Sequence, residues 1–120
     1  MGTAPAAVSK AADLVAWAHD FLGLTWEEVG AMLGTTGRTV QRWRDQETVP
    51  TRGNEERLDA VDELRFWLRT VFADDPAAAQ DWLRTRLLDL QGKTPLHAIK
   101  AGRVEKISEF LATFHSGAFI

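Results

Sequence analysis

The chain has 120 residues, no cysteine and a formal net charge of −3, with 45% hydrophobic and 26% charged residues. This is the composition of an ordinary globular chain, and it excludes disulfides and thiolate metal sites. No apolar run approaches the roughly 18 residues of a membrane span, and the Ala/Pro/Ser-rich start lacks a signal-peptide pattern. We therefore expect a cytoplasmic protein, in which any binding of nucleic acid depends on a local patch.

The first half of the chain shows three helical patterns in succession. Apolar residues at helical spacing predict a helix over residues 10–22. Thr25, with Glu28 three positions later, forms a capping-box pattern that begins a second helix, and Gly34 stops that helix. Thr36 caps a third helix, which ends before a polar segment rich in turn-forming residues.

The second half is helical by pattern as well. An apolar stripe predicts a long helix over residues 54–73, and helices that begin at Pro76 and Pro95 follow it. A last helix is expected over residues 103–115. Its inward-facing side chains are predicted to be Val104, Ile107, Phe110, Leu111 and Phe114. No segment alternates apolar and polar residues for long enough to indicate a strand, so we expect an all-α protein.

Residues 24–50, LTWEEVGAMLGTTGRTVQRWRDQETVP, have the layout of a helix-turn-helix, in which a glycine turn joins two short helices. Gly30 is small where the second helix approaches the first, and Gly34 allows a positive φ in the turn. Four apolar side chains are expected to pack inside this unit: Val29, Leu33, Val40 and Trp43. The layout resembles the Xre (phage-repressor-like) family.

The second helix of such a motif presents its N-terminal residues to base edges in the major groove. Its outward positions are expected to be Gly37, Arg38, Gln41, Arg42 and Asp45. Arginine suits guanine, glutamine suits adenine and a threonine methyl suits thymine, while further arginines hold phosphates. We therefore predict a surface for operator DNA that consists of Thr36, Gly37, Arg38, Gln41, Arg42 and Arg44.

A helical hairpin with a glycine turn also occurs as a plain structural unit, and this alternative stays open. Residues 36–52 carry four arginines against two acidic residues, a net charge of only +2. Specific DNA recognition would require a homodimer that spans two half-sites. Phe66 and Trp67 form a candidate dimer surface, although burial within the monomer accounts for them equally well. Trp17 and Trp82 are expected in the core.

Residues 74–120 carry a second pattern. It consists of an alanine-rich helix with Trp82, the block LQGKTPL at residues 90–96, an Ala-Gly stop and the closing FHSGAF. In this order, and after a helix-turn-helix, these features resemble the toxin-binding domain of Xre/MbcA/ParS-type antitoxins. The chain departs from that family at His97, where an acidic residue is frequent, and over residues 84–90, which are expected to be more helical.

The resemblance implies the antitoxin of a type II toxin–antitoxin system. Such antitoxins neutralise a toxin encoded beside them, commonly a RES-domain protein that consumes NAD or a relative with an ADP-ribosyltransferase-like fold. The helix-turn-helix often binds the shared promoter, so that the complex represses its own operon. The implied organisation is an Xre-like domain with a long linking helix over residues 1–73 and a toxin-binding domain over residues 74–120, within a homodimer that joins a hetero-oligomer.

The resemblance also implies that the C-terminal segment covers the active site of the toxin, and the apolar ending of the chain agrees in kind. The expected toxin contacts are Phe114, His115, Ser116, Gly117, Ala118, Phe119, Ile120, Lys100 and Arg103. A carboxylate at the end of this segment is a candidate mimic of an NAD phosphate. Alternatively, Phe119 and Ile120 pack on their own last helix, and the chain is a stand-alone helix-turn-helix regulator without a toxin partner.

The sequence indicates no catalytic, cofactor or metal site. His19, His97 and His115 lie far apart, and none has a second ligand at zinc-binding spacing. No serine stands in a nucleophile elbow, and no glycine-rich loop for phosphate is present. We therefore expect a protein that is not an enzyme, needs no cofactor and has no membrane partner.

Overall fold

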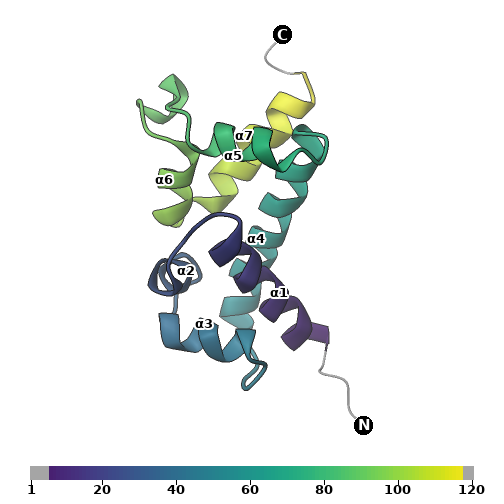
Figure 1. Cartoon of the computed structure of the whole chain (residues 1–120), viewed down its shortest axis with the longest axis vertical. Coiled ribbons are helices and arrows are strands. Elements are labelled where there is room, and N and C mark those ends of the chain that lie inside the picture. The colour runs from purple at the N-terminus through teal and green to yellow at the C-terminus, as the bar shows by residue number, and fades with distance from the viewer. Residues whose placement is uncertain (1–5, 118–120) are drawn as a thin grey trace. The chain divides into compact units, whose positions relative to one another are not determined.

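The computed structural model describes residues 6–117 (Figure 1). Its helices are α1 (Ala6–Asp20), α2 (Trp26–Met32), α3 (Gly37–Arg44), α4 (Arg52–Val71), α5 (Pro76–Leu83), the 3₁₀ helix η1 (Leu88–Leu90), α6 (Pro95–Lys100) and α7 (Val104–His115). One isolated antiparallel bridge, between Leu87 and Lys93, is the only strand-like pairing in this range. The prediction of an all-α protein is confirmed.

The chain divides into two compact units, Met1–Asp59 and Ala60–Ile120, and α4 contributes to both. The sequence places the boundary after this helix, between residues 73 and 74. The start of α4 is tied to the N-terminal unit, because the Asn54 side chain donates a hydrogen bond to the backbone oxygen of Leu33 (3.2 Å). Lys10 on α1 also forms an exposed ion pair with Asp59 (2.9 Å).

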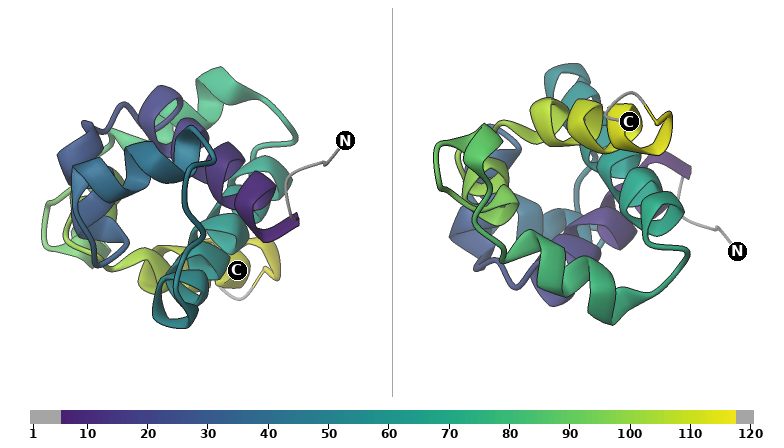
Figure 2. Two further views of the ribbon diagram at one scale, coloured as in Figure 1. Left: turned by 90° about the horizontal axis from the view of Figure 1, so that it is seen from below. Right: turned by 90° about the horizontal axis from the view of Figure 1, so that it is seen from above.

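In the N-terminal unit, α3 packs against α1 and α2 (Figure 2). Its buried side chains include Leu14, Val15, Ala18, Leu22, Leu24, Val29, Met32, Leu33, Val40 and Trp43. The capping box forms as expected: Thr25 Oγ1 accepts a hydrogen bond from the Glu28 amide (3.1 Å), and the Glu28 carboxylate accepts one from the Thr25 amide (2.9 Å). Such caps stabilise a helix by about 1 kcal/mol each.

Two glycines of the helix-turn-helix have the roles that the sequence predicts. A Cβ on Gly30 would lie 2.5 Å from the carbonyl carbon of Thr36, so only glycine lets α2 approach the start of α3 this closely. Gly34 has φ +75°, which is strained for residues with a Cβ. The turn between α2 and α3 therefore follows directly from these two positions.

The C-terminal unit consists of the later turns of α4 with α5, η1, α6 and α7. Its buried side chains include Leu64, Leu68, Ala79, Leu83, Leu90, Ala98, Ile99, Val104, Ile107 and Leu111. Both proline-initiated helices are capped: the Asp75 carboxylate accepts bonds from two amides of α5, and Thr94 Oγ1 accepts one from the His97 amide (3.0 Å). The start signals that we inferred at Pro76 and Pro95 are confirmed.

The prediction of a more helical segment over residues 84–90 is wrong. Helix α5 ends at Leu83, and only the short η1 follows. The Leu87 amide donates a hydrogen bond to the Lys93 carbonyl oxygen (3.0 Å). Gln91, with φ 58°, and Gly92, with φ +77°, turn the chain back between these residues. The Leu87 amide therefore bonds the Lys93 carbonyl oxygen, and it is not available for the hydrogen bonds of a continued α-helix.

Three aromatic residues are more exposed than the periodicity predicts. Phe114, expected to face inward, leaves 58% of its surface exposed because the last turn of α7 extends beyond the buried stripe that ends at Leu111. Trp17 and Trp82, expected in the core, are half-buried. Trp17 stacks on Phe21 with ring centroids 5.5 Å apart, whereas Trp82 lies against two phenylalanines of the C-terminal unit. These contacts cover part of each indole ring.

Candidate DNA-binding and partner-binding surfaces

Helix α3 presents the side chains for which DNA contact is predicted. Arg38 and Arg42 are exposed one turn apart on this helix, and neither forms an ion pair with any residue of the described range. Gln41, which lies between these arginines in the sequence, is half-buried. The Thr36 hydroxyl caps the helix by accepting a bond from the Thr39 amide (3.2 Å). Two free guanidinium groups on one helix can therefore reach phosphates or guanine edges.

Gly37 does not face outward as predicted. It is buried, and a Cβ at this position would lie 2.9 Å from Glu27 Oε2 and 3.0 Å from the Glu27 amide nitrogen. The first turn of α3 lies directly against the first turn of α2, which leaves no room for a side chain. Gly37 is therefore a packing position of the helix-turn-helix.

Arg44 is held within a local cluster. Its guanidinium bonds Asp45 through two nitrogens (2.8 and 3.0 Å), and its Cζ lies 4.9 Å from the ring centroid of Trp26. The hydrogen bond from Arg44 lowers the pKa of the Asp45 carboxyl, and the same bond raises the pKa of Arg44. A phosphate contact by Arg44 thus competes with this carboxylate, in contrast to Arg38 and Arg42.

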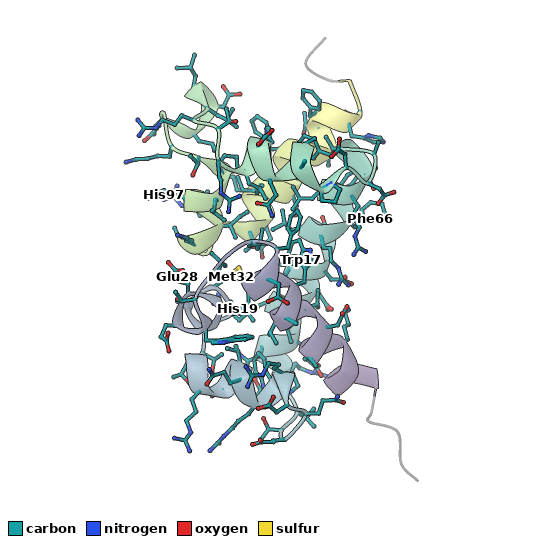
Figure 3. The ribbon with its side chains drawn as sticks, viewed as in Figure 1. Trp17, His19, Glu28, Met32, Phe66 and His97 are labelled. Carbon is teal, nitrogen blue, oxygen red and sulfur yellow. The ribbon has the colours of Figure 1, made fainter. Side chains whose placement is uncertain are left out.

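The other ring neighbour of Trp26 is His19, which is labelled in Figure 3. The two ring centroids are 4.0 Å apart, and the ring planes are nearly parallel. The His19 Nδ1 lies 2.8 Å from the backbone oxygen of Leu24. Because a carbonyl oxygen only accepts, Nδ1 carries the proton in this contact. Trp26 is therefore engaged in ring packing between His19 and Arg44.

The C-terminal unit contains an apolar pocket of about 320 Å³, which we call the aromatic pocket. It is lined by Val71, Phe72, Trp82, Leu87, Asp89, Phe110, Leu111 and Phe114. The centroids of Phe72 and Trp82 are 5.7 Å apart, and those of Trp82 and Phe110 are 6.1 Å apart. Phe114 thus joins an apolar surface with its neighbours, and it is accessible from outside.

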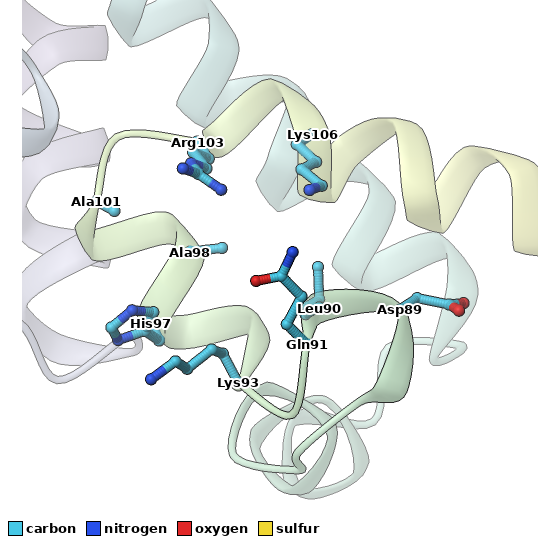
Figure 4. A pocket seen from close by; sticks show the side chains of 9 residues that line it. All are labelled: Asp89, Leu90, Gln91, Lys93, His97, Ala98, Ala101, Arg103 and Lys106. Atoms are coloured by element: carbon cyan, nitrogen blue, oxygen red, sulfur yellow. The ribbon is translucent and has the colours of Figure 1, made fainter.

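A second pocket of about 240 Å³, the cationic pocket, lies beside η1, α6 and the start of α7 (Figure 4). It is lined by Asp89, Leu90, Gln91, Lys93, His97, Ala98, Ala101, Arg103 and Lys106. Arg103 is one of the predicted toxin contacts, whereas Lys93 and Lys106 were not singled out by the sequence. The sequence did contain a signal for Lys106, because it follows Arg103 by three positions and therefore lies on the same face of a helix. Lys93 is brought beside them by tertiary structure.

The predicted toxin contacts at the end of the chain are only partly within the described residues. Phe114, His115 and Ser116 are exposed, and the His115 ring lies 5.8 Å from that of Trp67. Phe66 is 57% exposed, and its ring contacts that of Trp67 edge to face with the centroids 5.1 Å apart. Lys100 is exposed but lines neither pocket. Ala118, Phe119 and Ile120 lie outside the described range.

Other kinds of site are not found in residues 6–117. No group of three or more histidine, acidic or cysteine side chains stands close enough there to hold a metal ion. Among the helices of this range, none combines the length and the apolar character required to cross a membrane.

Residues 67–113 match the family described as the antitoxin Xre/MbcA/ParS C-terminal toxin-binding domain. Over 113 residues, the chain is 29% identical to the mycobacterial cidal antitoxin MbcA of Mycobacterium tuberculosis and of Mycobacterium bovis, and the match covers 94% of this chain and 98% of each relative. The resemblance to Xre/MbcA/ParS-type antitoxins is confirmed.

The likeness to these antitoxins extends to the fold. The crystal structure of the M. tuberculosis MbcT–MbcA toxin–antitoxin complex contains a chain that matches with a TM-score of 0.61 at 28% identity, over 91% of this chain and 96% of that chain. The segment that matches the family begins within α4 and includes α5, η1, α6 and most of α7. It therefore contains the whole lining of the cationic pocket and most of the aromatic pocket.

Proposed function

We propose that the chain binds and neutralises a cognate protein toxin through its C-terminal unit. The observation that carries this proposal is the match of residues 67–113 to a toxin-binding domain, together with the whole-chain likeness to the antitoxin MbcA. The structurally similar chain belongs to a complex of a toxin with its antitoxin. The toxin class that the resemblance favours is a RES-domain protein that consumes NAD, or one with an ADP-ribosyltransferase-like fold.

The proposed mode of inhibition is that the end of α7 and the segment after it cover the active site of the toxin. Three exposed residues, Phe114, His115 and Ser116, would begin this contact. Phe114 supports it best, because an aromatic side chain that is 58% exposed beside an apolar pocket gains from burial against a partner. Lys100 and Arg103 would lie at the charged rim.

The test is co-purification with the product of the neighbouring gene, followed by an assay of NAD consumption by that product. Wild-type protein should abolish the activity, and Phe114→Ala should weaken inhibition about tenfold or more. Phe66→Ala is the matched control, because Phe66 is equally exposed on the same unit. Equal losses for both variants, or unchanged inhibition by Phe114→Ala, would contradict the proposed contact. Failure to bind any toxin would overturn the function.

We further propose that the helix-turn-helix binds the promoter of the same operon as a homodimer, with Arg38 and Arg42 as the principal contacts. Both guanidinium groups are exposed without an ion pair in the described range, which supports this assignment. Fluorescence anisotropy with promoter DNA should show affinity that falls steeply with salt. The double variant R38A/R42A should lose specific binding, while R86A on the other unit should not. Retention of binding by the double variant would count against this surface.

A further inference from the structure

The cationic pocket gathers positive charge from two separate segments of the C-terminal unit. Lys93 comes from the loop after η1, and Arg103 and Lys106 come from the beginning of α7, while α6 adds the His97 ring to the lining. Figure 4 shows these side chains around one hollow, with Gln91 between them. The whole chain carries a net charge of −3, so this concentration of cations is a local feature and not a reflection of composition.

The charges of this pocket are not neutralised from within the described residues. Lys93, Arg103 and Lys106 form no ion pair or side-chain hydrogen bond with any residue of the range 6–117. Asp89 is the acidic residue of the lining, and its carboxylate points away from Lys93 and His97 in Figure 4. Cations gathered around one hollow repel each other, and a bound anion would relieve that repulsion.

The start of α7 adds a second, independent feature. Arg103 precedes this helix of 12 residues without any side-chain cap, although three of the other helices have a threonine at this position that accepts a hydrogen bond. The first amides of a helix without a cap retain hydrogen-bonding capacity and partial positive charge. Glu105 of the same turn does not line the pocket. An anion near Arg103 and Lys106 would therefore also meet the positive end of α7.

We propose that the cationic pocket binds a phosphate group, supplied as inorganic phosphate or as part of a small phosphorylated molecule. The arginine and the two lysines carry +3, and the Asp89 carboxylate brings the net charge of the lining to +2, which matches the charge of about −2 on a phosphate better than the −1 of a carboxylate. The volume of about 240 Å³ accommodates one such group, and it is smaller than the roughly 300–1,000 Å³ of sites that enclose whole drug-sized ligands. This site shares Arg103 with the proposed rim of the toxin contact, and its other lining residues lie outside the contacts proposed at the end of α7.

The test is a titration of the full chain at low ionic strength with inorganic phosphate, pyrophosphate and acetate. Binding is measured by isothermal titration calorimetry and by changes in amide NMR shifts. Phosphate should bind saturably at one site and shift the amide signals of Lys93, Thr94, Leu96 and His97 and of residues 103–106, while acetate should bind much more weakly. Tighter binding of pyrophosphate would identify a phosphorylated small molecule as the source, and equal or weaker binding would identify free phosphate.

Substitution of the cations provides the decisive comparison. R103Q and K106Q should each weaken phosphate binding about fivefold, and the double variant more than tenfold. R86Q is the control, because Arg86 is exposed on the same unit outside the pocket. Should the double variant fail to fold, K93Q replaces it. The proposal would be overturned if the pocket variants bound phosphate with wild-type affinity, or if acetate bound as tightly as phosphate. It would also be overturned if R103Q and K106Q weakened inhibition of the toxin but left phosphate affinity unchanged.

Discussion

The two units of this chain build their candidate surfaces in different ways. In the N-terminal unit, the predicted DNA contacts lie on one short helix, and caps and glycines within about 12 residues determine its position. In the C-terminal unit, the pockets are assembled from α4, α5, the loop around η1, α6 and α7. A surface on one helix tolerates changes elsewhere, whereas an assembled surface depends on every segment that contributes to it.

Gly30→Ala should have the largest effect and should distinguish the two units. The new Cβ would lie 2.5 Å from backbone of Thr36, so α2 and α3 must separate at an expected cost of about 3 kcal/mol in free energy of unfolding. Hydrogen exchange should then show loss of protection in α2 and α3 but less in α7. Uniform loss along the chain would show that both units unfold together.

Gly53→Ala is the control for that experiment. A Cβ at Gly53 meets nothing within 4 Å, and the residue lies in the first turns of α4. Alanine should therefore stabilise the chain by up to about 1 kcal/mol, because glycine loses more backbone entropy in a helix. A destabilised Gly53→Ala variant would mean that the start of α4 is not the helix seen here.

Equivalent cap removals should sharpen the comparison between the units. Thr36→Ala removes the bond to the Thr39 amide (3.2 Å), and Thr94→Ala removes the bond to the His97 amide (3.0 Å). Each should lower the free energy of unfolding by about 1 kcal/mol in urea denaturation. We expect only Thr94→Ala to reduce phosphate affinity, because α6 carries His97 into the pocket. An effect of Thr36→Ala on phosphate affinity would contradict the expectation that the phosphate site depends on the C-terminal unit alone.

Ser108→Ala should stabilise the C-terminal unit. Ser108 is 2% exposed, and its hydroxyl has no hydrogen-bond partner among the described residues. Removing a buried hydroxyl without a partner should raise the free energy of unfolding by about 1 kcal/mol. A higher midpoint in thermal denaturation is the expected result, and a lower midpoint would show that the hydroxyl is satisfied in solution.

Asp45→Asn should have the smallest effect, in the N-terminal unit. Arg44 lowers the pKa of the Asp45 carboxyl below its ordinary value of 3.8, so the carboxylate stabilises the folded state above that pH. This stabilisation is lost as the pH falls through the lower pKa of the folded state. The melting temperatures of wild type and variant should therefore differ slightly at about pH 6, and this difference should shrink as the pH is lowered below 3.8. A constant difference would indicate that the carboxylate is not responsible.

Sequence alone determined the order of the helices, the starts of those with a capping signal and the glycine turn, because these depend on residues within one or two turns of each other. The capping box of Thr25 and Glu28, the caps before Pro76 and Pro95, and the role of Gly34 are all local. The order of these local features also sufficed to recognise the resemblance to Xre/MbcA/ParS-type antitoxins, which the comparisons confirm.

Tertiary structure decided which side chains are buried and which are brought together. The burial of Gly37 depends on how closely α3 lies to α2, and the exposure of Phe114 depends on where the C-terminal core ends. The cationic pocket unites Lys93 with Arg103 and Lys106 because the return at residues 91–92 turns the chain beside α6. Such contacts join residues far apart in sequence, and helical periodicity, which relates only near neighbours, contains no information about them.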